Sequence, residues 1–363
     1  MRLFQLHTNL KPMFFKRALK AFIGATSIAL VIAGFYSFVP SNKVISFLPS
    51  KEKPPVTNSL SGRVGSDGPV LVVKIDDTQA AHPQAGLEDA DIVYIEQVEG
   101  GLTRLAAVFS SIIPEVIGPV RSARISDIEL LQQFGHVAFA YSGAQKRMLP
   151  VIAAANLQDL GAQRQSPTIY ATDPLRRPPT AMMLQAQKLM AKITEQKLSI
   201  AISKPAGWNF GDRPDTGTAI ASVKVSWPAN SYTATWSAQD KRWLLSQRGA
   251  PDISAAGTHL GPTTFLIQFV SITPSIYHDK VGGVTPFSAT VGNGTGYVLR
   301  DGVAISAKWS RPTADVGTIW TDMTGKEIKF AAGQVWVALT DRDPIFTPVS
   351  APKITDAPTP PTK

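Results

Sequence analysis

Two arginines spaced three residues apart, Arg121 and Arg124, are the residues whose types and spacing most directly suggest chemistry. They lie just before a predicted helix start, where Ser126 and Glu129 form a capping-box pattern. A helix N-terminus offers free N–H groups and a partial positive charge, and two guanidinium groups add paired donors for an anion. The pattern therefore predicts a phosphate or carboxylate site. An alternative stays open, in which both arginines form salt bridges with the protein's own carboxylates.

Two acidic residues, Asp76 and Asp77, follow an apolar run at residues 70–75 that has the length of a strand covered on both faces. Carboxylates at the end of a strand suit a general base or a divalent metal ion. The same pair is also common in turns and helix caps, so a structural role is the alternative.

A further basic candidate, Arg147, comes from a strand–glycine–helix segment. A strand is predicted over residues 136–141 and a helix over residues 144–155, with Arg147 in the first helical turn. Ligands of α/β sheets bind where strands end and helices begin. If the strand order brings these junctions together, we predict that one ligand site is formed by Asp76, Arg121, Arg124 and Arg147.

Glu99 and Arg104 flank a two-glycine hairpin signal at residues 100–101. If these glycines form the loop, paired residues have numbers that sum to 201. Arg104 then lies opposite Gln97, Glu99 is its diagonal neighbour on the same face, and Glu96 points to the opposite face. We include Glu99 and Arg104 in the candidate ligand site, with a structural ion pair as the alternative.

Several classes of chemistry lack the residues that they need. The chain has no cysteine, which excludes thiol chemistry, disulfides and a lipid-bearing cysteine. Its five histidines have no metal-site spacing, and there is neither a Gly-x-Ser-x-Gly elbow nor a Walker loop. We therefore predict no catalytic residue, no metal site and no cofactor.

The net charge of +9 is concentrated at the N-terminus. Residues 1–53 hold eight Lys and Arg against one acid, or +7, which leaves 28 basic and 26 acidic residues, or +2, for the rest. A nucleic-acid-binding protein needs basic charge on its folded part, so we predict no nucleic-acid partner.

An uncharged stretch at residues 21–39 is long enough to cross a membrane as a helix, and five basic residues precede it. The positive flank predicts a cytoplasmic segment at residues 1–20 and an extracytoplasmic remainder. The chain is thus predicted to be a single-pass protein of the cell membrane, with a cleaved signal peptide as the alternative. Residues 40–66 are predicted to be a linker and residues 346–363 a disordered tail.

The predicted fold class is α+β, with an N-terminal membrane helix and two extracytoplasmic domains. Residues 67–215 are predicted to form an α/β domain with a mixed sheet, and residues 216–345 a β-rich sandwich or barrel-like domain. In the first domain we predict strands at residues 70–75, 91–99, 102–113 and 136–141, and helices at residues 127–134, 144–155 and 180–196. Five of the six tryptophans of the second domain are interpreted as core anchors or as a glycan-stacking surface: Trp227, Trp236, Trp243, Trp309 and Trp336.

Several runs of this sequence resemble the YerB-like lipoprotein family of bacteria, a domain family of unknown function. They include Pro83–Leu87, Ala90–Tyr94, Glu99–Arg104, Gly118–Arg124 and Gly333–Trp336. The resemblance covers roughly residues 67–341, both domains of the family, and it implies an extracytoplasmic protein associated with the envelope. The chain departs from the family in lacking the lipid-bearing cysteine, which the predicted membrane helix replaces. No established activity or catalytic residue comes with the resemblance.

Three functions are compatible with these features. The first is a non-catalytic envelope protein that binds an anionic or glycan ligand, such as a cell-wall component, through Arg121 and Arg124. The second is an enzyme that acts on wall polymer or a lipid-linked phosphate, using Asp76 or Asp77 with the arginines. The third is a scaffold that binds an envelope protein partner through the β-rich domain.

Overall fold

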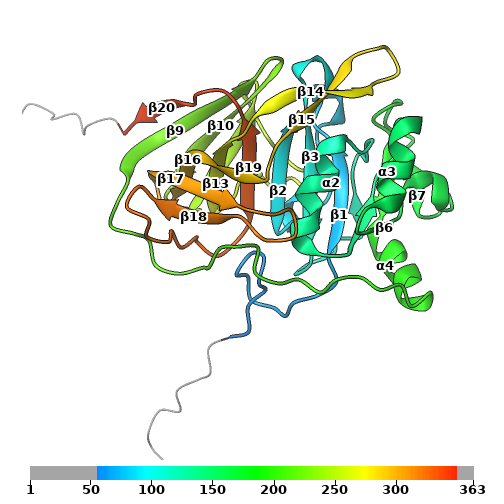
Figure 1. Cartoon of the computed structure of the whole chain (residues 1–363), viewed down its shortest axis with the longest axis horizontal. Helices are drawn as coiled ribbons and strands as arrows, with labels where there is room; N and C mark the ends of the chain where they lie inside the picture. The colour runs from blue at the N-terminus through cyan, green and yellow to red at the C-terminus, as the bar shows by residue number, and fades with distance from the viewer. Residues whose placement is uncertain (1–54, 350–363) are drawn as a thin grey trace, which may run out of the picture. The chain divides into compact units, whose positions relative to one another are not determined.

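The computed structural model describes residues 55–349 (Figure 1). The predicted cytoplasmic segment, the membrane helix at residues 21–39 and residues 350–363 lie outside this part. Within residues 55–349, no helix is both long and apolar enough to cross a membrane. Two predicted boundaries shift: Thr57 and Val64 close a turn that buries Leu60, so this stretch belongs to the fold and not to a linker. Ile345–Pro348 forms strand β20 instead of starting a disordered tail.

Five strands of the first half form a mixed sheet in the order β2-β3-β1-β5-β6. β1 pairs antiparallel with β3 and parallel with β5. Every residue of β1 is buried, as expected of an apolar strand with both faces covered. The bounds are β1 Leu71–Asp76, β2 Ile92–Gln97, β3 Thr103–Phe109, β5 Val137–Ala140 and β6 Leu157–Asp159.

The three described α-helices are short. They are α2 Ile125–Leu131, α3 Leu149–Ala154 and α4 Ala186–Glu195. The predicted helix at residues 180–196 is wrong in its first turn, because Met182–Gln185 forms strand β8 between β4 and β7. Its apolar side chains Met183 and Leu184 are buried there. The two partner strands are β4 Val116–Ile117 and β7 Tyr170–Thr172.

Short strands with alternating burial fill the second half, which confirms the β-rich prediction. In β11, for example, every second residue is buried. The bounds are β9 Thr218–Trp227, β10 Asn230–Ser237, β11 Arg242–Gln247, β12 Ala250–Pro251, β13 Thr264–Phe269, β14 Ile272–His278, β15 Val284–Ser288, β16 Gly292–Arg300, β17 Val303–Arg311, β18 Ile319–Asp322 and β19 Val335–Thr340.

One strand, β19, joins the two halves into a continuous sheet. It lies parallel to β13 on one side and parallel to β2 on the other. The sheet therefore runs β12-β11-β10-β9-β17-β16-β13-β19-β2-β3-β1-β5-β6 across the position of the predicted domain boundary. In Figure 1, β19 lies between β13 and the blue and cyan strands of the first half.

The tryptophans are core residues rather than a glycan-stacking surface. Trp227, Trp243, Trp309 and Trp336 are buried, and Trp236 is partly buried against Trp243. Trp227 and Trp243 belong to one hydrophobic core cluster and Trp309 to the other, and the indole N–H of Trp227 donates to the backbone oxygen of Leu339. The rings of the four buried tryptophans each stabilise the core by about 3–5 kcal/mol when compared with alanine.

Candidate functional site

The hairpin of β2 and β3 differs from its predicted register by one residue. Gln97 pairs with Thr103, and Glu96 pairs with Arg104. The loop is longer than two glycines, because Gly100 and Gly101 lie inside a 3₁₀ turn at positive φ. A Cβ atom on Gly101 would lie 2.4 Å from Cβ of Pro228, so this turn needs glycine for space as well.

This register puts Arg104 beside different acids from those predicted. Directly opposite residues of an antiparallel pair share a face, so Arg104 shares a face with Glu96 on β2 and with Asp76 on β1. The prediction that Glu96 points to the opposite face from Arg104 is wrong. The predicted contact between Glu99 and Arg104 is absent from the ion pairs of residues 55–349, in which Glu99 pairs with Arg124.

Arg104 is buried yet largely without partners. Its side chain lines a cavity, and the residue is 7% exposed. Its Nε and Nη1 atoms find no hydrogen-bond acceptor within residues 55–349. Buried donors are nearly always paired, because an unpaired one costs about 1–3 kcal/mol. Arg104 therefore lines the cavity while two of its donor atoms, Nε and Nη1, are left without a partner.

Arg121 lines one side of the cavity and forms an ion pair with Asp76. The Arg121 Nε lies 3.1 Å from Oδ2 of Asp76, and the Arg121 Nη1 donates to the backbone oxygen of Pro179 at 3.2 Å. The backbone places the two residues together, since the Asp76 N–H donates to Pro119 O and Val120 bridges to Ile75 at the end of β1. Asp76 is fully buried, so it acts on the cavity through Arg121 and does not line it.

Arg124 precedes α2 and is neutralised by Glu99. Its Nε and Nη2 donate to Oε2 of Glu99 at 3.0 and 2.8 Å. Burial raises the pKa of Glu99, but the hydrogen bonds and charge of Arg124 outweigh burial and leave this pKa below its ordinary value. The predicted alternative, a salt bridge to the protein's own carboxylate, thus describes Arg124 well.

The predicted capping box of Ser126 and Glu129 is wrong, because α2 begins at Ile125, two residues earlier than predicted, and Arg124 is its N-cap residue. The carboxylate of Asp127 accepts the Arg124 backbone N–H at 2.6 Å. Ser126 and Glu129 accept backbone N–H groups at the end of β15 and after it instead. These contacts attach the second half of the chain to α2.

A hairpin from the second half, β14 and β15, completes the cavity. The Thr285 hydroxyl donates to Glu99, and the Gln145 side-chain amide donates to His278 O at 2.7 Å. No strand was predicted here, because Pro274 and Pro286 interrupt both segments. The two prolines are tolerated as cross-strand neighbours in a sheet of only two strands.

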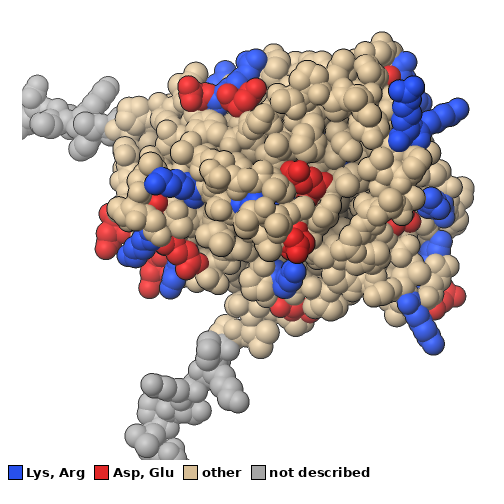
Figure 2. All heavy atoms as spheres, viewed as in Figure 1, with Lys and Arg blue, Asp and Glu red and all other residues tan. Residues whose placement is uncertain are grey.

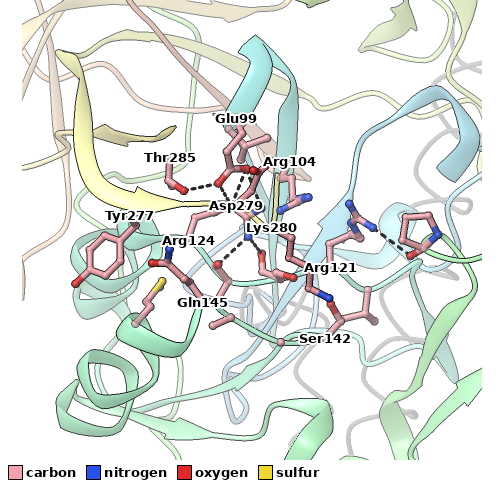
Figure 3. A pocket seen from close by; sticks show the side chains of 18 of the residues that line it. Glu99, Arg104, Arg121, Arg124, Ser142, Gln145, Tyr277, Asp279, Lys280 and Thr285 are labelled. Atoms are coloured by element: carbon pink, nitrogen blue, oxygen red, sulfur yellow. Dashed lines mark hydrogen bonds and ion pairs between the residues drawn. The ribbon is translucent and has the colours of Figure 1, made fainter. Parts of the chain in front are cut away.

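The cavity has a volume of about 1070 Å³. Five predicted residues line it together, namely Glu99, Arg104, Arg121, Arg124 and Arg147. Figure 3 shows the labelled arginines lying close to one another, with Tyr277 and Thr285 contributed by the hairpin. Charged lining residues that sequence reasoning missed are Lys146, Asp279 and Lys280.

The cavity is cationic. Six Lys and Arg and two Asp and Glu line it, an excess of four positive charges, which the buried carboxylate of Asp76 lowers to three. Burial, followed by the charges of Arg124 and Arg121, lowers the pKa of Arg104 to about 9. Elsewhere the surface is mixed: Figure 2 shows Lys and Arg interspersed with Asp and Glu on a mostly uncharged face. An anion bound in the cavity would relieve this repulsion.

Asp77 does not take part in the cavity. Successive strand residues point to opposite faces, and Asp77 points away from Asp76 into contact with the second half. Its carboxylate accepts hydrogen bonds from Tyr232, Gln247 and Asn230. The residues described contain no cluster of three or more His, Asp or Glu able to hold a metal ion. The two adjacent aspartates therefore do not form a joint acid–base or metal site.

A buried ionic cluster lies on the same face of the sheet as Arg104. The Lys74 Nζ is 2.7 Å from both Glu96 Oε1 and Asp127 Oδ1, and all three side chains are inaccessible or nearly so. Burial raises the pKa of Glu96 to about 7, an effect that Lys74 partly opposes.

We expect Glu96→Gln to alter the pH dependence of stability. Because the pKa of Glu96 is raised from 4.5 to about 7 by folding, its stabilising contribution is complete below about pH 4.5 and is lost as the pH rises through about 7. As the pH rises from about 4.5 to about 7, the wild type should therefore lose about 1–3 kcal/mol of unfolding free energy relative to Glu96→Gln. Urea unfolding at several pH values measures this difference.

The exposed carboxyl of Glu195 offers a matched control, since Glu195→Gln should leave the pH profile unchanged. A Glu96→Gln profile parallel to that of the wild type would contradict the prediction.

Two domain families match this chain. Residues 57–199 match the N-terminal domain of DUF3048, a protein of unknown function, and residues 223–337 match its C-terminal domain. The protein named "Putative lipoprotein YerB" of Bacillus subtilis (strain 168) is 25% identical over 301 residues, which cover 79% of this chain and 86% of the relative. The crystal structure of YerB from Bacillus subtilis superposes with a TM-score of 0.67 at 20% identity, covering 79% of this chain and 97% of that one. Because the two matched domains together span most of its length, the chain belongs to the DUF3048 family.

Proposed function

We propose that this protein is a non-catalytic, envelope-associated binding protein that holds an anionic ligand in the cavity lined by Arg104, Arg121 and Arg124. Association with the envelope is supported by the name of its Bacillus subtilis relative as a lipoprotein. The apolar stretch at residues 21–39 would anchor the chain in the absence of a lipid-bearing cysteine, with the folded part outside the cell.

The observation that carries the proposal is the state of Arg104. A buried arginine with a structural role uses its donors, as Arg300 does: it is 4% exposed and bonded to Asp301, Gly211 O and Lys329 O. Arg104 is as deeply buried but leaves Nε and Nη1 unpaired at the cavity wall. An anion that accepts both would gain charge-assisted hydrogen bonds, each stabilising by about 1.5–3 kcal/mol.

We expect Arg104→Met to weaken anion binding by about 30-fold or more, through the loss of these bonds. The same change should leave the ligand-free protein equally stable or more stable by about 1–2 kcal/mol, because it removes unpaired buried donors. The measurements are isothermal titration with pyrophosphate, inorganic phosphate and glutarate, and urea unfolding. Both use the full chain in a non-ionic detergent with empty micelles subtracted.

Arg300→Met is the matched control. It removes a buried arginine whose donors are paired, so it should lower the free energy of unfolding by about 2–4 kcal/mol and leave anion affinity unchanged. Strong destabilisation by Arg104→Met with no anion bound by the wild type would contradict the proposed function and assign Arg104 to the core.

A further inference from the structure

The cavity is far larger than a small anion requires. Its volume of about 1070 Å³ is that of a pocket for a whole organic ligand, since pockets of about 300–1,000 Å³ enclose drug-sized molecules. The cationic groups occupy only part of the wall. A ligand that fills the cavity must therefore have a second, uncharged part.

Much of the rest of the wall is apolar, and three segments supply most of its apolar residues. They are the turn between β2 and β3, the segment that leads into β8, and the tip of the β14–β15 hairpin. The apolar lining residues of these segments are Val98, Leu102, Pro178, Pro179, Ala181, Met182, Tyr277 and Val281. Because Arg121 Nη1 donates to Pro179 O, this apolar wall begins directly beside the arginines.

Apolar side chains continue from the cavity onto the hairpin surface. Val281, at the tip, is 90% exposed, and Ile276 on β14 is 72% exposed. Lys280, between them in sequence, also lines the cavity. An exposed apolar tip beside a cationic cavity is suited to a ligand that has an apolar part and an anionic part.

The head of that ligand should carry more than one negative charge. The lining has an excess of four positive charges, or three after Asp76 is counted. A single carboxylate would leave most of this excess uncompensated, and burial together with the charges of Arg124 and Arg121 already lowers the pKa of Arg104. A phosphate monoester or a diphosphate supplies two or more negative charges and several acceptor oxygens.

We propose that the ligand is an amphiphile with a phosphate or diphosphate head and an apolar chain, the head bound by Arg104 and Arg121 and the chain by the wall of Leu102 and Met182. This inference rests on the proposed function and adds the class of ligand.

The test compares three probes on the full chain by isothermal titration: pyrophosphate, geranyl diphosphate and geraniol. Geranyl diphosphate should bind at least about 10-fold more tightly than pyrophosphate, because its apolar carbons leave water. Met182→Gln should remove about 5- to 10-fold of that affinity without changing pyrophosphate binding. Met323→Gln, at a half-exposed position outside the cavity, is the matched control and should change neither.

The outcomes separate this inference from the proposed function. Equal affinities for pyrophosphate and geranyl diphosphate would overturn the amphiphile while anion binding stands. Full retention of geranyl diphosphate affinity in Met182→Gln, or equal binding of geraniol, would likewise overturn it. In the titrations of the wild type with small anions, tighter binding of glutarate than of pyrophosphate and inorganic phosphate would overturn the phosphate head. If no anion binds the wild type, the proposed function itself fails.

Discussion

Replacing Lys74 with methionine is expected to lower the free energy of unfolding by about 3–5 kcal/mol, because it leaves the Glu96 carboxylate buried without a counter-charge. Lys74 is fully buried, and its Nζ contacts Glu96 and Asp127, each at 2.7 Å. Removing one partner from a buried ionic cluster is far more costly than removing a surface pair, which contributes about 0–1 kcal/mol.

The measurement is urea unfolding of Lys74→Met beside Lys308→Met, which removes a lysine from an exposed position on β17. The control should change stability by less than about 0.5 kcal/mol. A second readout separates charge from packing: because protonation neutralises Glu96, the loss in Lys74→Met should shrink as the pH is lowered from about 8 to about 5. A loss below about 1 kcal/mol, or one that does not depend on pH, would contradict the role given to Lys74.

This cluster matters for the cavity because two of its residues contact or neighbour arginines that line the cavity. Glu96 is the cross-strand neighbour of Arg104, and Asp127 fixes the backbone of Arg124 at the start of α2. The arginines that face the ligand site are thus attached to residues held by Lys74. We expect binding by a destabilised Lys74→Met variant to weaken only at temperatures where its fold begins to loosen.

Local sequence signals were sufficient for four strands of the first half, β1, β2, β3 and β5, but not for β4, β6, β7 and β8. A nearly continuous apolar run predicts β1, and the segment before α2 supplies Arg121 and Arg124. The segment before Arg121 contacts the end of β1, since Val120 bridges to Ile75 and the Asp76 N–H donates to Pro119 O. These contacts place Arg121 beside Asp76. That part of the candidate site was therefore predictable in outline.

The remaining errors come from geometry that composition does not encode. The turn at Gly100 and Gly101 is longer than the glycines alone indicate, because Gly101 also packs against Pro228 from the second half. That one-residue shift in register changes the neighbour of Arg104 from Gln97 to Glu96. Likewise, Lys280 reaches the cavity on a hairpin whose strand pattern is masked by Pro274 and Pro286.

The place of β19 could not be predicted at all, because parallel pairing joins residues that are distant in sequence. Val335 pairs with Ile92 on β2 and with Thr264 on β13. An apolar run such as this indicates a buried strand but not its neighbours. The pattern of the second half therefore predicted a separate domain. In the structure, β19 lies between β13 and β2 in a sheet that both halves share.

Trp336→Ala is accordingly expected to lower the free energy of unfolding by about 3–5 kcal/mol and to destabilise both halves together. Trp336 is fully buried on β19, and its indole N–H donates to Gln334 Oε1 at 2.7 Å. The Gln334 amide in turn donates to Leu87 O and Ala90 O of the first half at 2.7 and 2.8 Å. Loss of the indole thus opens a cavity in the shared core and frees the side chain that connects β19 to the first half.

Hydrogen exchange during urea unfolding distinguishes a shared core from two independent ones. In the wild type and in Trp336→Ala, amides of β1 and β10 should lose protection in one transition, because β19 transmits the loss to strands on both sides. Trp236→Ala, on β10 near the edge of the sheet and only partly buried, is the matched control and should cost less, about 1–2 kcal/mol. Early loss of protection in β10 with β1 intact would show that β19 belongs energetically to the second half alone. A single transition would mean that the part of the cavity wall formed by β3 and the turn before it is stabilised by the same core as the β14–β15 hairpin.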